Sequence, residues 1–175
     1  MDGLSPARNE RAAQTLLFAF LATVVMLFAG FTSAWLIRRT GSDWGRLQLP
    51  WLAYANTAVL ALSSLTLERG RVAARGEGQA GAWRSLGGTL ALGLVFLAGQ
   101  VGLWRALSQH GAFVTSTPQG AFLFLLSAVH GLHLLGGLVA LAWILHRRAA
   151  PRGVAVYWHF LGLAWLYVLG LLHLA

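Results

Sequence analysis

The chain has no cysteine, no lysine and few charged residues, and each absence narrows what it can be. Without cysteine, it has no disulfide, thiolate zinc site or iron–sulfur cluster. Only 10% of its 175 residues are charged and 57% are hydrophobic, whereas a typical soluble domain has about 25% charged and about 45–50% apolar residues. This balance excludes an ordinary water-soluble globule.

Acidic residues are absent from the interior of the apolar runs. All five lie outside these runs or at their edges: Asp2, Glu10, Asp43, Glu68 and Glu77. Carboxylates inside a membrane usually mark proton relays and ion pathways. Their absence argues against a pump or an ion-coupled transporter that acts alone.

Long runs without any charged residue dominate what is present. They cover 16–37, 47–67, 85–104, 106–146 and 153–175. Because roughly 20 apolar residues cross the hydrocarbon layer as a helix, we predict an all-α integral membrane protein, a bundle of five transmembrane helices. The expected spans are about 15–38, 49–68, 84–107, 118–147 and 153–174, which form a single membrane domain (15–175) after a polar N-terminal tail (1–14).

The arginines predict the orientation of this bundle. With five spans, nine of them fall on the side of the N-terminus: Arg8, Arg11, Arg69, Arg71, Arg75, Arg84, Arg147, Arg148 and Arg152. The other side holds Arg38, Arg39, Arg46 and Arg105. The positive-inside rule therefore places the N-terminus in the cytoplasm and the C-terminus outside. This position at the membrane, and not nucleic-acid binding, accounts for the net charge of +8.

Histidine is the remaining chemical resource within the spans. His130 and His133 are three residues apart, so on a helix they face the same way. One interpretation is a haem-b membrane anchor, because at ~1.5 Å per residue His130 and His173 lie about 24 and 30 Å from the loop at 147–152, which is close enough for a pair of axial ligands. The other is that these are neutral imidazoles, hydrogen-bonded to neighbouring helices, water or lipid.

The end of the fourth span and the start of the fifth carry the cations and donors that a lipid phosphate needs. Tyrosine and tryptophan also collect at the membrane–water boundary. The candidate lipid-binding residues there are His146, Arg147, Arg148, Tyr157, Trp158 and His159. His130 and His133, deeper in the fourth span, are further candidates as neutral imidazoles that can hydrogen-bond to lipid phosphate. Trp158 and Trp165 are seven residues apart, and this stripe is expected to contact a partner helix or a lipid chain.

Five motifs, in order, carry a resemblance to a known family. They are V-V-M-L-F-A-G-F-T-S-A-W (24–35), L-P-W-L-A-Y-A-N-T-A-V-L-A-L-S-S (49–64), Gln100 with Trp104, H-G-L-H-L-L-G-G (130–137) and Y-W-H-F-L-G-L-A-W-L (157–166). Together they resemble subunit III of the haem-copper terminal oxidases, the family that includes cytochrome c oxidase. The chain is similar to the five-helix form of this family.

The resemblance implies a subunit with no catalytic residue and no metal or haem of its own. The complex would lie in a bacterial inner membrane, and this chain would contact subunit I directly. Subunits I and II would hold the haem and copper. Phospholipids would lie between its helices, and it would support proton uptake. Three positions depart from the family, which has acids where this chain has Val24, Leu103 and Gly162. Roles that depend on those carboxylates are therefore not carried over.

An accessory subunit of a nitric oxide reductase is the alternative within the same fold. The missing acids favour it, because a reductase that pumps no protons does not need them as a proton antenna. The residues leave open whether the complex takes electrons from cytochrome c or from a quinol.

Overall fold

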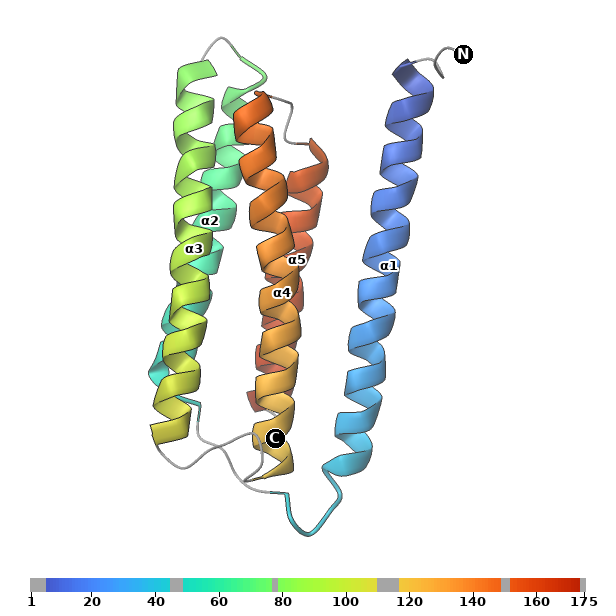
Figure 1. The fold of residues 1–175 in the computed structure, drawn as a ribbon, viewed down its shortest axis with the longest axis vertical. Helices are drawn as coiled ribbons and strands as arrows, with labels where there is room; N and C mark the ends of the chain where they lie inside the picture. The colour runs from blue at the N-terminus through green and yellow to red at the C-terminus, as the bar shows by residue number, and fades with distance from the viewer. Residues whose placement is uncertain (1–5, 45–48, 77–78, 110–116, 149–151, 174–175) are drawn as a thin grey trace.

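The computed structural model describes residues 6–44, 49–76, 79–109, 117–148 and 152–173. These residues form five α-helices: α1 (Pro6–Arg38), α2 (Trp51–Ala73), α3 (Gln79–Gln109), α4 (Pro118–Arg147) and α5 (Arg152–His173). Successive helices run in opposite directions, so the two termini lie at opposite ends of the bundle (Figure 1). The predicted all-α, five-helix architecture is confirmed.

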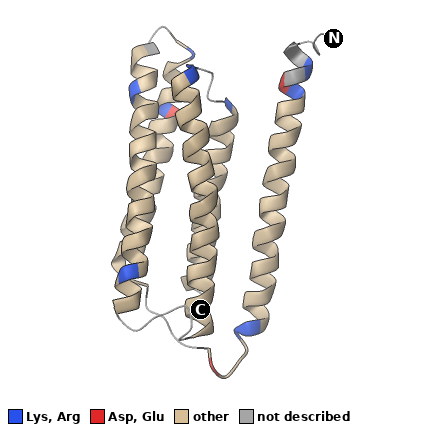
Figure 2. Cartoon of the chain, in the orientation of Figure 1, with Lys and Arg blue, Asp and Glu red and all other residues tan. Residues whose placement is uncertain are grey.

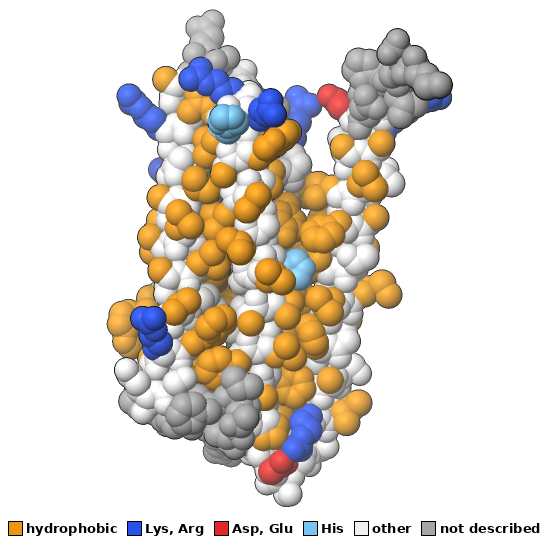
Figure 3. All heavy atoms as spheres, viewed as in Figure 1, with side chains coloured by type: hydrophobic (Ala, Val, Ile, Leu, Met, Phe, Trp, Pro, Cys, Tyr) orange, Lys and Arg blue, Asp and Glu red, His pale blue; other side chains and the backbone are white. Residues whose placement is uncertain are grey.

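Four of these helices are long and apolar enough to cross a membrane, namely α1 from Glu10 onward, α3 from Ala80 onward, α4 and α5. Hydrophobic side chains cover the middle of the molecule and the charged ones gather at its ends (Figure 3). Among the described residues α2 does not meet the same criterion. It carries polar residues that face the interior, such as Asn56 and Ser63, which are 3% and 0% exposed. The five-span prediction is therefore confirmed for four helices.

Several helices extend past the expected spans. α1 begins at Pro6 instead of residue 15, so most of the predicted polar tail is helical, while residues 1–5 lie outside the described part of the chain. α2 continues to Ala73, beyond the expected residue 68. An ion pair between Glu68 and Arg71, three residues apart, supports this extra turn. The length of an apolar run matches the thickness of the hydrocarbon layer, but the helix can continue beyond the end of the run.

Local signals begin and end α4. Thr117 precedes the helix, and its hydroxyl accepts a hydrogen bond from the Gly120 N–H at 3.1 Å, while Pro118 occupies the first turn. Arg148 follows the last turn in the left-handed conformation with φ 51°. This matches the expected fourth span, 118–147. The expected break at Pro151 lies outside the described residues.

The helices do not pack equally. α2 and α3 form the most extensive pair, and α4 packs on both α3 and α5. α1 stands apart from the other four helices, and Figure 1 shows it as a separate rod beside the bundle. Within the described part of the chain, α4 and α5 are the only helices that it contacts. It buries one stripe, made of Leu21, Val24, Phe28 and Trp35.

The arginines lie at the ends of the helices, as expected (Figure 2). The end that holds the start of α1, the loop between α2 and α3, and the junction of α4 and α5 carries the larger group. At the other end Arg38 pairs with Asp43, and the Arg38 guanidinium lowers the pKa of that carboxyl below its usual value. Arg46, which the sequence predicts at this end, lies outside the described residues.

Candidate functional site

His130 lies in the centre of the bundle and not at a lipid-facing surface. It is 0% exposed, and its ring packs against Phe96 of α3 and Trp165 of α5 at centroid distances of 5.9 and 5.2 Å. Neither of its ring nitrogens has a hydrogen-bond partner among the described residues. The ring is therefore a core element that joins three helices.

His133, one turn further along α4, faces a different neighbour. Its Nδ1 lies 2.7 Å from the Val129 carbonyl oxygen, and its ring lies 6.3 Å from those of Phe20 and Phe28 on α1. The prediction that His130 and His133 face the same way does not hold for their contacts, because the His130 ring packs on α3 and α5 and the His133 ring packs on α1. Side chains three residues apart diverge enough around a helix to meet different neighbours.

Tyr157, Trp158 and His159 are consecutive on α5 and point in three directions. The Tyr157 hydroxyl donates to the His133 carbonyl at 2.8 Å, on the side of α1. Trp158 is 0% exposed, and its indole N–H donates to Ser63 Oγ of α2 at 3.0 Å. His159 is half-buried, with Nε2 3.7 Å from a carboxylate oxygen of Glu68.

The tryptophan stripe of α5 packs on α2. Trp165, 1% exposed, donates its indole N–H to Thr57 Oγ1 at 2.9 Å, as Trp158 does to Ser63. Of the two expected contacts of this stripe, a partner helix and a lipid chain, the structure shows the helix, which is α2 of the same chain. The two indoles fix α5 against α2 inside the chain.

The remaining lipid candidates are exposed at the end of α4. His146 and Arg147 occupy its last turn and Arg148 caps it. Cations there interact favourably with the negative end of the helix dipole. Of the eight predicted residues, these three remain together at the surface, while His130, Tyr157 and Trp158 are buried.

His130 and His173, the two histidines of the haem-b interpretation, lie in different surroundings. His130 is enclosed by aromatic rings, whereas His173 is exposed at the end of α5 with its Nδ1 3.3 Å from the Tyr54 hydroxyl. Within the described residues, no group of three or more His, Cys, Asp or Glu side chains is arranged to hold a metal ion.

The three positions where the resembling family has acids differ in burial. Val24 and Leu103 are each 2% exposed and belong to the hydrophobic core. Gly162 is partly exposed on α5, and a Cβ added there would lie 3.7 Å from Ser64 Oγ. Leucine and valine thus fill interior space that a carboxyl group could occupy only with a hydrogen-bond partner.

A cavity of about 520 Å³ opens between α1, α4 and α5 at the arginine-rich end. Its apolar wall includes Leu17, Phe20, Ile144 and Tyr157, and its polar lining is Glu10, Gln14 and Arg152. Of these residues, the sequence predicts only Tyr157 as part of a binding site. The signal available in the sequence was that the starts of the first and fifth spans must share one side of the membrane.

These features define a class of protein: a helical membrane bundle whose interior polar groups tie one helix to another. No family model matches the chain. It is similar to the probable cytochrome c oxidase subunit 3 of Mycobacterium tuberculosis strain H37Rv, with 31% identity over 163 residues, 84% of this chain and 80% of the relative. The cytochrome c oxidase subunit 3 of Synechocystis is 28% identical over 174 residues, 89% of this chain and 72% of the relative.

A third relative is the cytochrome c oxidase subunit 3 of Corynebacterium diphtheriae, 29% identical over 165 residues that cover 84% of this chain. The chain belongs to the cytochrome c oxidase subunit 3 family, as its five motifs predict. It is accordingly a multi-pass membrane protein of the respiratory chain.

Proposed function

We propose that this chain is the non-catalytic subunit III of a respiratory haem-copper oxidase, in which the complex reduces oxygen to water and translocates protons. The observation that carries the proposal is the similarity to cytochrome c oxidase subunit 3 over 84% of the chain. The structure supports it, because the buried Trp158, Trp165 and His130 pack against other helices of the same chain.

Its partners are the oxidase subunits I and II, which hold the haem and copper, while this chain holds neither. It packs directly on subunit I, stabilises it, and supports proton uptake. Its place is the bacterial inner membrane, with the N-terminus in the cytoplasm, since nine of thirteen arginines fall on that side in a five-helix chain.

Phospholipid binding is part of the same proposal. The exposed Arg147 and Arg148 supply cations at a helix end, beside the exposed His146, and this is a position where lipid phosphates are recognised. The rings of Phe20 and Tyr157, 5.9 Å apart, supply an apolar surface between α1 and α5 for an acyl chain.

The decisive experiment is a reduced-minus-oxidised absorption spectrum of the tagged chain, purified gently from native membranes and again after its partners are stripped with detergent. A haem signal that accompanies the gentle preparation and disappears on stripping supports an oxidase subunit. A haem that stays with the stripped chain and is lost in His130→Ala would instead support a haem-b anchor. A gentle preparation without any haem would contradict the proposal.

A further inference from the structure

Two polar side chains in the centre of the bundle have hydrogen-bonding atoms that nothing in the described chain satisfies. Gln100 of α3 is 2% exposed and His130 of α4 is 0% exposed. Among the described residues, Gln100 Nε2 and both ring nitrogens of His130 are buried and have no hydrogen-bond partner. Unbonded donors and acceptors are unfavourable in an apolar interior, so each such group requires an explanation.

The contacts between α3 and α4 place Gln100 and His130 at the same level of the bundle. One turn before Gln100, the Phe96 ring lies 5.9 Å from the His130 ring. One turn after Gln100, the Trp104 indole donates to Ser127 Oγ, and Ser127 lies one turn before His130. Gln100 is therefore located between two contacts that α3 makes with the same turn of α4.

Asn56 of α2 determines which end of the Gln100 amide remains unbonded. Its Nδ2 atom donates to Gln100 Oε1 and to the Phe96 carbonyl oxygen, each at 3.1 Å. Because the Gln100 oxygen faces this donor, the Nε2 group of the same amide points away from Asn56. Gln100 thus has N–H donors that require an acceptor.

The His130 ring has the complementary requirement. A charged imidazole would be costly in this apolar interior, so the ring is neutral and has one donor and one acceptor nitrogen. The Phe96 ring is inclined at 74° to it, and an aromatic face can receive an N–H group. An aromatic face supplies no donor for the second nitrogen, and Gln100 makes no direct bond to it. The acceptor nitrogen of His130 therefore requires a donor.

We propose that Gln100 and His130 bind one water molecule, which accepts a hydrogen bond from Gln100 Nε2 and donates one to the acceptor nitrogen of His130. Both side chains, with their neighbours Asn56, Phe96 and Trp165, are buried, so the ligand has to be small. Water meets this requirement, and buried waters typically bond to two to four polar groups that lack other partners. The water extends the bond between Asn56 and Gln100 into a chain that joins α2, α3 and α4. This site does not depend on the proposed function.

Cryo-electron microscopy of the complex that contains the full chain tests this site, at a resolution that shows ordered water. We expect density for one atom about 2.7–3.2 Å from both Gln100 Nε2 and one His130 nitrogen. Gln100→Met and His130→Phe, which retain much of the side-chain volume, should each lose this density. The control is Thr66→Val, which removes a different bond between α2 and α3 and should keep it.

The map of the wild type decides the question even if a variant does not assemble. A map without this density, or with Gln100 bonded directly to His130, would overturn the inference. Density that is bonded to only one of the two side chains would also contradict the bridge. Haem content does not enter these outcomes, so they are distinguishable from a failure of the proposed function.

Unfolding of the same variants in denaturing detergent gives an independent test. If one water serves both side chains, Gln100→Met and His130→Phe combined should raise the unfolding equilibrium constant less than the product of their separate effects. We expect a difference of about three- to twentyfold, the range for hydrogen bonds between membrane helices. His130→Phe combined with Thr66→Val should give the full product, because Thr66 is ten residues, or ~15 Å, from Asn56 along α2. Independent effects of Gln100→Met and His130→Phe would contradict a shared water.

Discussion

Single polar residues tie the helices of this bundle together. Asn56 of α2 uses its side-chain amide to donate to the Phe96 carbonyl oxygen and to Gln100 Oε1, both of α3, at 3.1 Å each. Thr66 and Thr89 exchange a hydrogen bond of 2.9 Å between the same two helices. In lipid the hydrophobic effect does not drive helices together, so close packing and such bonds decide which faces meet.

Gly99 is the residue that lets Asn56 reach α3. A Cβ added at Gly99 would lie 2.2 Å from Asn56 Oδ1, so Gly99→Ala must displace the amide or separate the helices. We expect the free energy of unfolding to fall by about 1–3 kcal/mol, the usual cost of overpacking. Unfolding in mixed micelles of increasing denaturing detergent measures it. Gly30→Ala is the control, because nothing lies within 4 Å of its added Cβ, and an equal loss in both variants would contradict the argument.

The indole of Trp158 contributes a specific bond as well as volume. Ser63→Ala and Trp158→Phe, alone and combined, form a double-mutant cycle for the 3.0 Å bond between these side chains. We expect a coupling of about 0.6–1.7 kcal/mol, as measured for hydrogen bonds between helices in a membrane. Repeating the cycle with Ser64→Ala, whose residue lines the α2–α5 cavity, should give a coupling near zero. Zero coupling for Ser63 would show that Trp158 acts through packing alone.

Among whole elements, α4 has the most varied surroundings. One face packs on α3 through His130 and Leu138 and on α5 through Gly137, another meets α1 through His133, and its end carries exposed cations. A bond from the Trp104 indole to Ser127 Oγ, 2.9 Å, adds a further link to α3. This helix therefore joins the interior of the bundle to its charged end.

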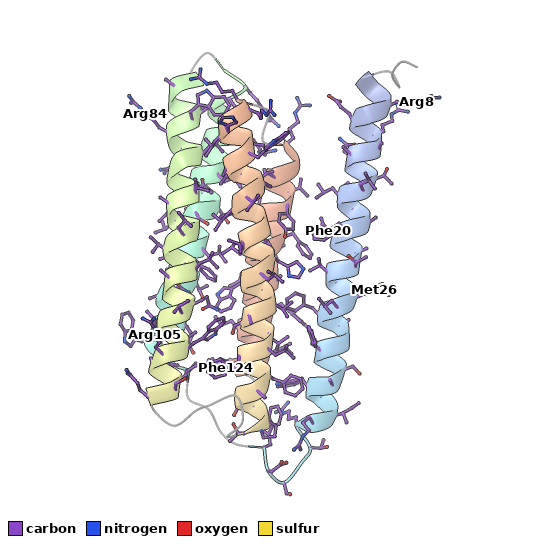
Figure 4. The ribbon with its side chains drawn as sticks, in the orientation of Figure 1. Arg8, Phe20, Met26, Arg84, Arg105 and Phe124 are labelled. Atoms are coloured by element: carbon purple, nitrogen blue, oxygen red, sulfur yellow. The ribbon has the colours of Figure 1, made fainter. Side chains whose placement is uncertain are left out.

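The cations at the end of α4 are expected to hold lipid phosphate. Replacing Arg147 and Arg148 together by Gln should reduce the phospholipid that co-purifies with the complex and shorten its active lifetime, while the initial haem spectrum stays unchanged. Phosphorus analysis and a time course of oxygen consumption provide the two measurements. Arg105→Gln, on α3 near the opposite end (Figure 4), is the control. Unchanged lipid content and lifetime would remove these arginines from the site.

The existence and order of the helices could be predicted because each apolar run is long enough to span a membrane. The direction of each side chain could not, because it depends on how a helix is rotated against its neighbours. Trp158 and Trp165 show this, since their seven-residue spacing predicts a shared stripe but does not say that α2 covers it. The same limit applies to the site: the sequence predicts Arg147 as a charge at a helix end, whereas only the folded chain brings Glu10 and Arg152 to the lining of one cavity.

At the scale of the whole molecule, the helices place most charged side chains at two opposite ends (Figure 2). The loop between α1 and α2 lies at one end and the loop between α2 and α3 at the other (Figure 1). Because the second end carries the larger group of arginines, the positive-inside rule places it in the cytoplasm. The orientation is thus a prediction about two loops that can be tested separately.

The absence of cysteine makes this test direct, because no native thiol of this chain reacts beside a single introduced one. Ser42 lies in the first loop and Gly76 in the second, and both are exposed. With a membrane-impermeant maleimide added to spheroplasts, we expect Ser42→Cys to be labelled and Gly76→Cys to be protected until the membrane is opened with detergent. In inside-out vesicles the pattern should reverse. Labelling of Gly76→Cys alone in spheroplasts would invert the orientation, and would place the open end of the cavity between α1, α4 and α5 on the outer side of the membrane.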